Sequence, residues 1–296
     1  MERIDFSLSK LPSKKTNLTL ALGGFDGFHL GHMALAREAA LFSDGPSGIL
    51  FFAKPFKQGK VLSDLEDKVR FAFSSGLDYA YCLHNEESFF GLSASSFLDL
   101  LSLLGVSRLV CGEDYSFGKG KEGDARMLKE RFAVEVVPFV KDKKGEKIGT
   151  HRIKTLLEQG DIKEANELLG RHYETKGEVV HGLNNGRRIG FPTGNLSCST
   201  PYLLPSNGVY AGLVYLSGIP YKAMMNVGDN PTVGQLKESQ QEAYLFGYEG
   251  DAYGKRAYFQ YLYRIREEKK FASLQELKKQ LLRDESEVLA YFSSLH

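Results

Sequence analysis

The chain has 296 residues, enough for roughly two domains of ordinary size. Its 38 basic side chains nearly balance 37 acidic ones, for a net charge of +1, which argues against a nucleic-acid-binding surface spread over the whole protein. No apolar run approaches the ~20 residues of a membrane span, and the N-terminus lacks the apolar segment of a signal peptide. We expect neither nucleic acid nor a membrane as partner, although a local basic patch is compatible with this net charge. Small-molecule substrates are expected from the glycine-rich motifs described below.

Short continuous apolar runs alternate with helical patterns in the first half of the chain. The runs that predict strands are 17–22, 48–53, 77–83, 107–112 and 132–139. The segments with helical spacing between them are 31–42, 65–75, 93–105 and 123–132. This alternation predicts a doubly wound, Rossmann-like α/β domain, in which ligands bind at the carboxyl ends of the strands near the point where strand order reverses.

The pattern changes after residue 150. Residues 150–170 predict two short helices, with Gly160 between them and Gly170 as a stop. The next segments alternate apolar and polar residues and predict a small antiparallel β-barrel from 176–182, 208–216, 221–228, 241–248 and 255–265. A helix is expected to begin near Ser273, with a second over 285–295. We place the domain boundary at about residue 170, giving domains 1–170 and 171–296.

Three cysteines, Cys82, Cys111 and Cys198, lie far apart in the sequence. Their spacing matches no metal site, and an odd, low number of thiols is typical of a reducing compartment. We expect buried structural thiols and a cytoplasmic protein.

The first glycine-rich turn, LGGFDGFHLGH, joins a predicted strand to a predicted helix. Backbone N–H groups of such a turn and the helix N-terminus can hold a phosphate, to which His29 and His32 can donate. The turn lacks the Lys-Ser/Thr of a P-loop and the GxGxxG spacing of a dinucleotide site. We predict attack on the α-phosphate of a nucleotide; a metal site, or turn glycines with surface histidines, are the alternatives. The predicted nucleotide-binding residues of this turn are Gly24, Phe25, Asp26 and Gly27.

The second glycine-rich segment, GEVVHGLNNGRRIGFPTGNL, spans 177–196. Its glycines allow a loop to fold over nucleotide phosphates, and Pro192 fixes the backbone from which Thr193 and Asn195 project. The oxygens of these two side chains suit Mg²⁺. A simple hairpin-end turn is the alternative. Gly182, Arg187 and Gly190 belong to the same segment.

Phosphoryl transfer to a hydroxyl also needs a proton acceptor. Glu242 lies on an alternating strand, on the same face as Tyr244, Phe246 and Tyr248. A carboxylate on an aromatic face is either functional or at a sheet edge, and the pattern alone leaves both open for Glu242.

Both glycine-rich segments resemble one known family. GGFDGFHLGH is similar to the signature of the nucleotidylyltransferase superfamily in its bacterial flavin branch, the bifunctional riboflavin kinase/FAD synthetases. Residues 177–196 resemble the riboflavin kinase signature, and residues 110–124 resemble a second motif of the flavin branch. The resemblance implies flavin contacts at Asp114, Phe117 and Gly118, and at Arg266 in the segment YRIREEKKF. It also implies that Glu242 is the base of the kinase reaction and that Gly182, Arg187 and Gly190 bind the nucleotide, with Thr193 and Asn195 holding Mg²⁺.

Two segments depart from the family pattern. Residues 51–55 read FFAKP where the family has FEPHP, and residues 148–154 read IGTHRIK where it has ISSTRIR. Thr150 keeps a hydroxyl and Arg152 keeps a guanidinium, so the resemblance implies that both contact nucleotide phosphates.

The resemblance implies an enzyme that phosphorylates riboflavin with Mg-ATP to FMN and then adenylylates FMN with ATP to FAD and pyrophosphate. One alternative is a riboflavin kinase whose N-terminal domain has become a flavin- or nucleotide-binding module. Others are a non-enzymatic flavin-binding regulator and a cytidylyl- or pantetheine-type nucleotidyltransferase. We expect no covalent enzyme intermediate, and a monomer or weak homo-oligomer.

Overall fold

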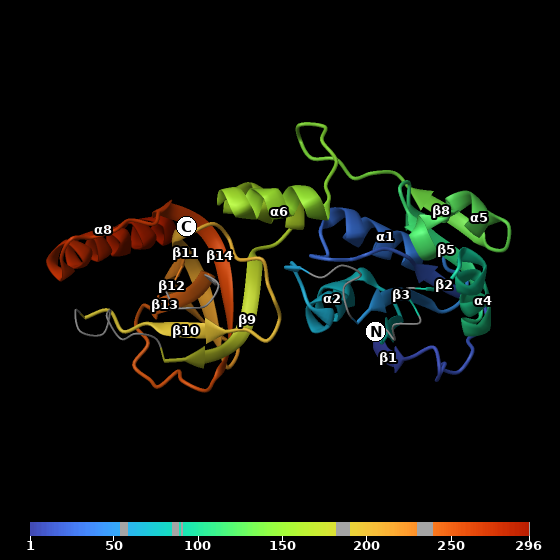
Figure 1. Ribbon diagram of the computed structural model, residues 1–296, viewed down its shortest axis with the longest axis horizontal. Coiled ribbons are helices and arrows are strands. Elements are labelled where there is room, and N and C mark those ends of the chain that lie inside the picture. Colours follow the sequence, from blue (N-terminus) through green and yellow to red (C-terminus); the bar gives the residue numbers. More distant parts are fainter. Residues whose placement is uncertain (54–58, 85–88, 90, 182–189, 230–238, 296) are drawn as a thin grey trace. The chain divides into compact units, whose positions relative to one another are not determined.

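The computed structural model describes residues 1–53, 59–84, 89, 91–181, 190–229 and 239–295. The chain divides into two compact units, Met1–Thr150 and His151–His296 (Figure 1). In the part of the chain that the structure describes, no helix is long and apolar enough to cross a membrane.

The first unit contains a parallel sheet in the order β1-β4-β3-β2-β5-β8. Its strands are β1 (Glu2–Phe6), β2 (Leu18–Ala21), β3 (Ser47–Phe52), β4 (Tyr79–Leu83), β5 (Val106–Gly112) and β8 (Ala133–Val137). Alternate residues of β3 enter different apolar clusters, Leu50 and Phe52 one and Ile49 and Phe51 the other. Both faces of the sheet are therefore buried, which confirms the doubly wound fold.

Helices and a small hairpin complete the first unit. They are α1 (Leu30–Leu41), α2 (Leu65–Ala72), α4 (Ala94–Leu104) and α5 (Ala125–Lys129), with the hairpin strands β6 (Ser116–Phe117) and β7 (Gly123–Asp124) and short 3₁₀ turns at Phe73–Ser75 and Lys119–Lys121. The edge strand β1 was not predicted, because four of its five residues are partly or fully exposed and form no apolar run.

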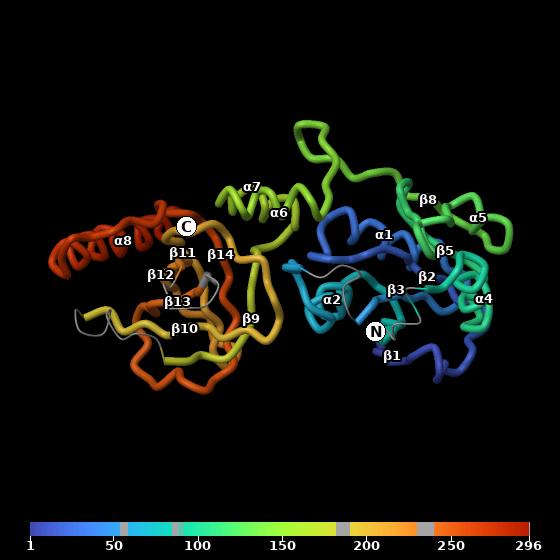
Figure 2. Tube along the Cα trace, viewed as in Figure 1, coloured from blue at the N-terminus to red at the C-terminus, as the bar shows by residue number. Residues whose placement is uncertain are grey.

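The second unit begins with α6 (Thr150–Gln159) and α7 (Ile162–Leu169), the two short helices that the sequence predicts (Figure 2). Gly160 and Gly170 have positive φ values of 79° and 70°, as expected where helices end. Asn166 of α7 donates to the backbone oxygen of Tyr261, 2.9 Å away, so α7 packs on the barrel. The compact unit thus starts about twenty residues before the predicted boundary near residue 170, because these helices fold with the barrel.

The rest of the second unit is a closed antiparallel barrel in the order β10-β13-β12-β11-β14-β9, as predicted. Its strands are β9 (Tyr173–Val180), β10 (Gly194–Ser197), β11 (Gly208–Leu216), β12 (Ile219–Asp229), β13 (Ser239–Leu245) and β14 (Arg256–Glu267). The short β10 was not predicted as a strand; it pairs with both β9 and β13 and closes the barrel.

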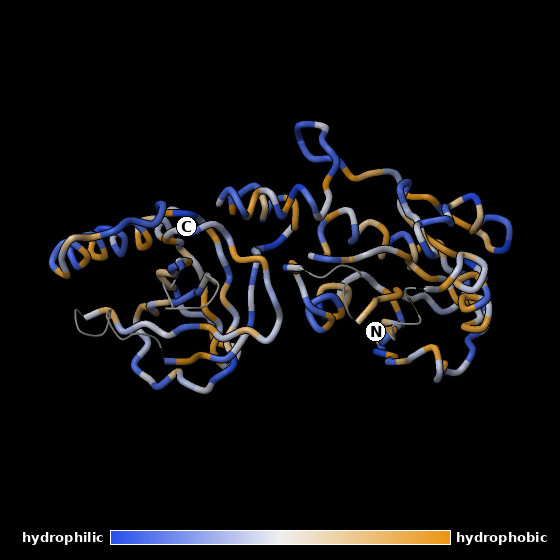
Figure 3. The backbone as a smooth tube through the Cα atoms, viewed as in Figure 1, coloured by the Kyte–Doolittle hydropathy of each residue, from blue (hydrophilic) through white to orange (hydrophobic). Residues whose placement is uncertain are grey.

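One C-terminal helix, α8 (Leu274–Ser293), covers part of the outer face of the barrel, where Val288 and Phe292 are buried against it. Figure 3 shows hydrophobic and hydrophilic residues alternating along this helix. Ser273 caps it by accepting from the backbone N–H of Glu276 at 3.2 Å, as predicted. The prediction of a second helix over 285–295 was wrong, because no glycine or proline interrupts residues 274–293 and the helix continues.

Candidate functional site

The first glycine-rich turn lies at the carboxyl end of β2, beside β5. The sheet order reverses between these two strands, so the turn occupies the switch point of the sheet. Gly27 has a φ of 80°, and a Cβ there would lie 2.7 Å from Cδ1 of Leu62. Only glycine fits this conformation and this space.

Two residues predicted to bind nucleotide instead shape this turn. The Asp26 carboxylate accepts from the backbone N–H groups of Leu62 and Ser63, at 2.8 and 3.2 Å. The Phe25 side chain is fully buried and packs edge-on against Phe51. Phe25 as a whole is buried, whereas Gly24 is exposed and the space beside it is open.

His29 and His32 lie together at the N-terminus of α1. His29 caps the helix, since its Nδ1 accepts from the backbone N–H of His32 at 3.4 Å. The two rings are stacked with centroids 3.7 Å apart. Because Nδ1 of His29 is an acceptor, its Nε2 carries the proton and can donate to a bound anion.

A segment from the end of the first unit lies against the same turn. The Thr150 hydroxyl donates to the backbone oxygen of Asp26 at 3.0 Å. Asp114 follows β5, and its carboxylate accepts from Lys147 Nζ at 2.6 Å. Lys147 also lies 3.6 Å from the centroid of the Phe139 ring. The structure therefore brings the Asp114 and Thr150 segments to the carboxyl edge of the sheet, where the histidines lie.

Phe117 and Gly118, predicted as flavin contacts, have a structural role. The Phe117 ring is buried and packs on Phe97, with centroids 5.2 Å apart. Gly118 has a φ of 76°, and a Cβ there would lie 2.7 Å from the backbone nitrogen of Ala94. Both residues thus help to fix the hairpin that follows Asp114. Flavin contacts of Phe117 and Gly118 stay a prediction.

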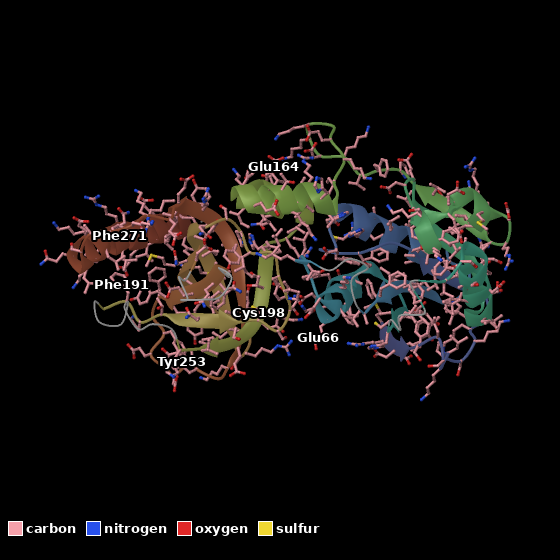
Figure 4. The ribbon with its side chains drawn as sticks, viewed as in Figure 1. Glu66, Glu164, Phe191, Cys198, Tyr253 and Phe271 are labelled. Atoms are coloured by element: carbon pink, nitrogen blue, oxygen red, sulfur yellow. The ribbon has the colours of Figure 1, made fainter. Side chains whose placement is uncertain are left out.

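Arg152 lies in α6, within the second compact unit. Its guanidinium donates to the Glu164 carboxylate of α7 at 2.5 Å (Glu164 is labelled in Figure 4). A contact of Arg152 with nucleotide phosphates stays a prediction.

The second unit contains a pocket of about 300 Å³ on the face of the barrel that α8 covers. The predicted residues Thr193, Asn195, Glu242 and Arg266 all line it. In the strand register, Glu242 lies between Asn195 of β10 and Asn226 of β12. Four residues predicted from three separate segments of the sequence therefore meet in one cavity.

Hydrogen bonds orient the Glu242 carboxylate in this pocket. The Thr193 hydroxyl donates to Oε2 at 3.0 Å, and Asn226 Nδ2 donates to Oε1 at 3.5 Å. Asn226 was not predicted as a site residue. Nothing along the sequence shows that Asn226 pairs with Glu242, because that neighbourhood arises only from strand register.

The backbone that carries Thr193 is held from the opposite side. The Tyr253 hydroxyl donates to the Thr193 backbone oxygen at 3.5 Å, and the Tyr253 ring stacks on His181 with centroids 3.6 Å apart. Gly190, at the start of this described segment, has a φ of 94°. The predicted residues Gly182 and Arg187 lie outside the described residues.

The other wall of the pocket is mostly apolar. Phe191 before β10, Phe271 before α8 (both labelled in Figure 4), and Leu277 and Leu281 of α8 line it. The pocket thus combines a polar side suited to phosphoryl groups with an apolar side suited to a flat aromatic ring.

The polar side also suits a hard cation. A hydroxyl and a side-chain amide oxygen, from Thr193 and Asn195, are ligands that Mg²⁺ accepts together with water and phosphate oxygens. Among the described residues, no cluster of three or more His, Cys, Asp or Glu side chains could hold a metal ion alone.

The described thiols are poor nucleophiles. Burial raises the pKa of Cys82 to about 12 and the pKa values of Cys111 and Cys198 to about 11. All three therefore stay protonated near neutral pH.

Two family models match the chain in succession. The model described as FAD synthetase matches residues 11–152, and the model described as riboflavin kinase matches residues 169–292. The chain is 35% identical to the bifunctional riboflavin kinase/FMN adenylyltransferase of Listeria monocytogenes, over 94% of each chain. It is 33% identical to the Bacillus subtilis protein of the same name, over 96% of each.

A solved structure from Streptococcus pneumoniae, described as a macrolide-efflux protein, has a similar fold. It is 33% identical, with a TM-score of 0.86 over 96% of this chain and 97% of that one. Its description differs from those of the curated relatives, although the shared fold extends over both units.

Proposed function

The chain belongs to the family of bifunctional riboflavin kinase/FMN adenylyltransferases, and from this premise we propose how its residues carry the two reactions. The enzyme phosphorylates riboflavin with ATP to FMN and adenylylates FMN with a second ATP to FAD and pyrophosphate. The alternative of a kinase with an inactive first domain has less support, since a FAD synthetase model matches residues 11–152.

In the barrel pocket, the 5′-hydroxyl of riboflavin attacks the γ-phosphorus of ATP. The new bond joins that oxygen to phosphorus, the bond to the β,γ-bridging oxygen breaks, and ADP leaves. The hydroxyl proton passes to the Glu242 carboxylate. Thr193 and Asn226 hold both carboxylate oxygens, so the base is oriented before substrate arrives.

Thr193 and Asn195 would hold Mg²⁺ in this pocket. The Thr193 hydroxyl gives its hydrogen to Glu242 and keeps its lone pairs for a cation. When bound, the ion neutralises charge on the nucleotide phosphates. Arg187, Gly190 and Gly182 would contact the same phosphates, and the flavin ring would lie along the apolar wall beside Arg266.

In the first unit, a phosphate oxygen of FMN attacks the α-phosphorus of ATP. The α,β-bridging bond breaks and pyrophosphate leaves. His29 and His32 stabilise the charge that develops on the phosphorus oxygens, and the turn from Gly24 to Gly27 supplies backbone N–H groups. Thr150 and Arg152 would contact the nucleotide phosphates, and Asp114 a polar edge of the flavin.

The domain limits and setting are also part of the proposal. We assign FMN adenylylation to residues before about 170 and riboflavin phosphorylation to those after, with α6 and α7 between the two family matches. Three free thiols favour the reducing cytoplasm. We propose a monomer or weak homo-oligomer that acts on small molecules and not on nucleic acid.

The observation that carries this proposal is the meeting of Thr193, Asn195 and Glu242 in one pocket. The test is product analysis over time from riboflavin, ATP and Mg²⁺. FMN should appear first and FAD afterwards, and a chelator should stop both. A parallel reaction with added FMN is the control for the second step. If neither FMN nor FAD forms from riboflavin, the proposal is overturned.

A further inference from the structure

A carboxylate interrupts the apolar stripe with which α8 faces the barrel. The inward positions of the helix are Leu277, Leu281, Asp284, Val288 and Phe292, spaced by three or four residues. Asp284 is 0% exposed. Burying a carboxylate is costly unless a charged partner and hydrogen bonds compensate it, so its position in this stripe needs an explanation.

Asp284 has this compensation. Arg266 of β14 donates from Nε to Oδ1 at 2.8 Å and from Nη2 to Oδ2 at 2.7 Å, a two-bond contact with fixed geometry. Gln280, one turn earlier in α8, donates to Oδ1 at 2.8 Å. Only 13% of the Arg266 side chain is exposed, so the contact between β14 and α8 is largely shielded from water.

The contact lies directly behind the apolar wall of the pocket. Leu281 is three residues before Asp284 and Leu277 is seven before, so all three share one helix face. Both leucines and Arg266 line the pocket, whereas Asp284 does not. A polar residue in an apolar seam specifies register, because a shift along the seam would leave its charge unpaired.

We propose that Asp284 is a positioning residue for riboflavin: through Arg266 it sets the register of α8, and thereby places Leu277 and Leu281 against the flavin ring. This inference rests on the proposed kinase function of the barrel. The polar side of the pocket is carried by β10, β12 and β13, so the ATP site does not depend on this contact.

Steady-state kinetics of Asp284→Asn in the full-length protein test the proposal. The variant loses the charge but nearly keeps the size of the side chain. We expect the KM for riboflavin to rise at least about tenfold, with kcat within about threefold and the KM for ATP within about twofold of wild type. An exposed carboxylate of the same helix gives the matched control: Glu287→Gln should leave all three values unchanged.

The Arg266→Met background tests whether Asp284 acts through Arg266. Adding Asp284→Asn to Arg266→Met should raise the riboflavin KM by less than about twofold further. If Asp284→Asn does not fold, Asp284→Glu replaces it in the test, because glutamate keeps the charge but moves it by one methylene. This variant should raise the riboflavin KM at least about threefold.

Each contrary result has a distinct meaning. An unchanged riboflavin KM in folded Asp284 variants, a fall in kcat at constant KM, or full additivity with Arg266→Met would overturn the role of Asp284. Failure of the wild-type protein to form FMN would instead overturn the proposed kinase function.

Discussion

At the scale of single residues, the barrel site depends on how Glu242 is held. Its carboxylate accepts from Thr193 and Asn226, which come from different segments of the chain. Both oxygens of Glu242 therefore act as hydrogen-bond acceptors, and a general base must likewise accept a proton.

The substitution Glu242→Gln removes the proton acceptor while keeping the shape of the side chain. We expect FMN formation to fall by about 10²–10⁴-fold, the usual contribution of a general base. FAD formation from supplied FMN should stay unchanged, and both rates can be followed by chromatography. Wild-type rates of FMN formation in this variant would reject Glu242 as the base.

The reactivity of the Cys198 thiol should depend on pH. Burial raises the pKa of this thiol to about 11, and alkylation requires the thiolate. The alkylation rate of Cys198 in the folded protein should still rise about tenfold per pH unit between pH 8 and 10. Peptide mass spectrometry measures this, with denatured protein as the control. A rate that levels off near pH 9 in the folded protein would contradict the shift.

Glu242, Thr193 and Asn195 could be predicted because fixed local spacing marks them. Asn226 and Asp284 could not, since their partners come from other strands or from a helix that the sequence does not align with the barrel. The burial of the Phe25 and Phe117 rings could not be predicted either, because a motif does not show which of its side chains enters the core.

At the scale of elements, both the position of the turn after β2 and its glycine-rich, strand-to-helix character were predicted from the sequence. A buried strand, glycines and a helix start are local signals, and the structure puts this turn at the switch point of the sheet. By contrast, β1 has too few buried residues to give a signal, and the predicted break in α8 overlooked the absence of a helix-breaking residue.

Replacing Gly27 by alanine tests the turn. A left-handed φ disfavours alanine by about 1–2 kcal/mol, and the new Cβ would lie 2.7 Å from Leu62. We expect FAD formation from FMN to fall at least about tenfold, a loss of about 1.4 kcal/mol in transition-state stabilisation, while FMN formation is kept. Gly145→Ala, also at positive φ but with no neighbour within 4 Å, is the control for backbone strain alone. Equal FAD-forming rates in both variants would show that the contact with Leu62 does not matter.

At the scale of the whole molecule, each unit has its own core, and each contains one of the two glycine-rich segments of the sequence. The apolar clusters of the parallel sheet and the cluster beneath α8 share no residues. The family models likewise divide between residues 11–152 and 169–292. The two reactions should therefore be separable by substitution in one chain.

Mixing two disabled full-length variants tests that central claim most directly. Glu242→Gln should form FAD from FMN at the wild-type rate but FMN from riboflavin about 10²–10⁴-fold more slowly. The double variant His29→Ala/His32→Ala should form FMN but no FAD. Riboflavin and Mg-ATP given to an equal mixture should yield FAD, because FMN released by one variant reaches the other. Loss of both activities in either folded variant, or no FAD from the mixture when added FMN is still converted, would contradict two separate sites.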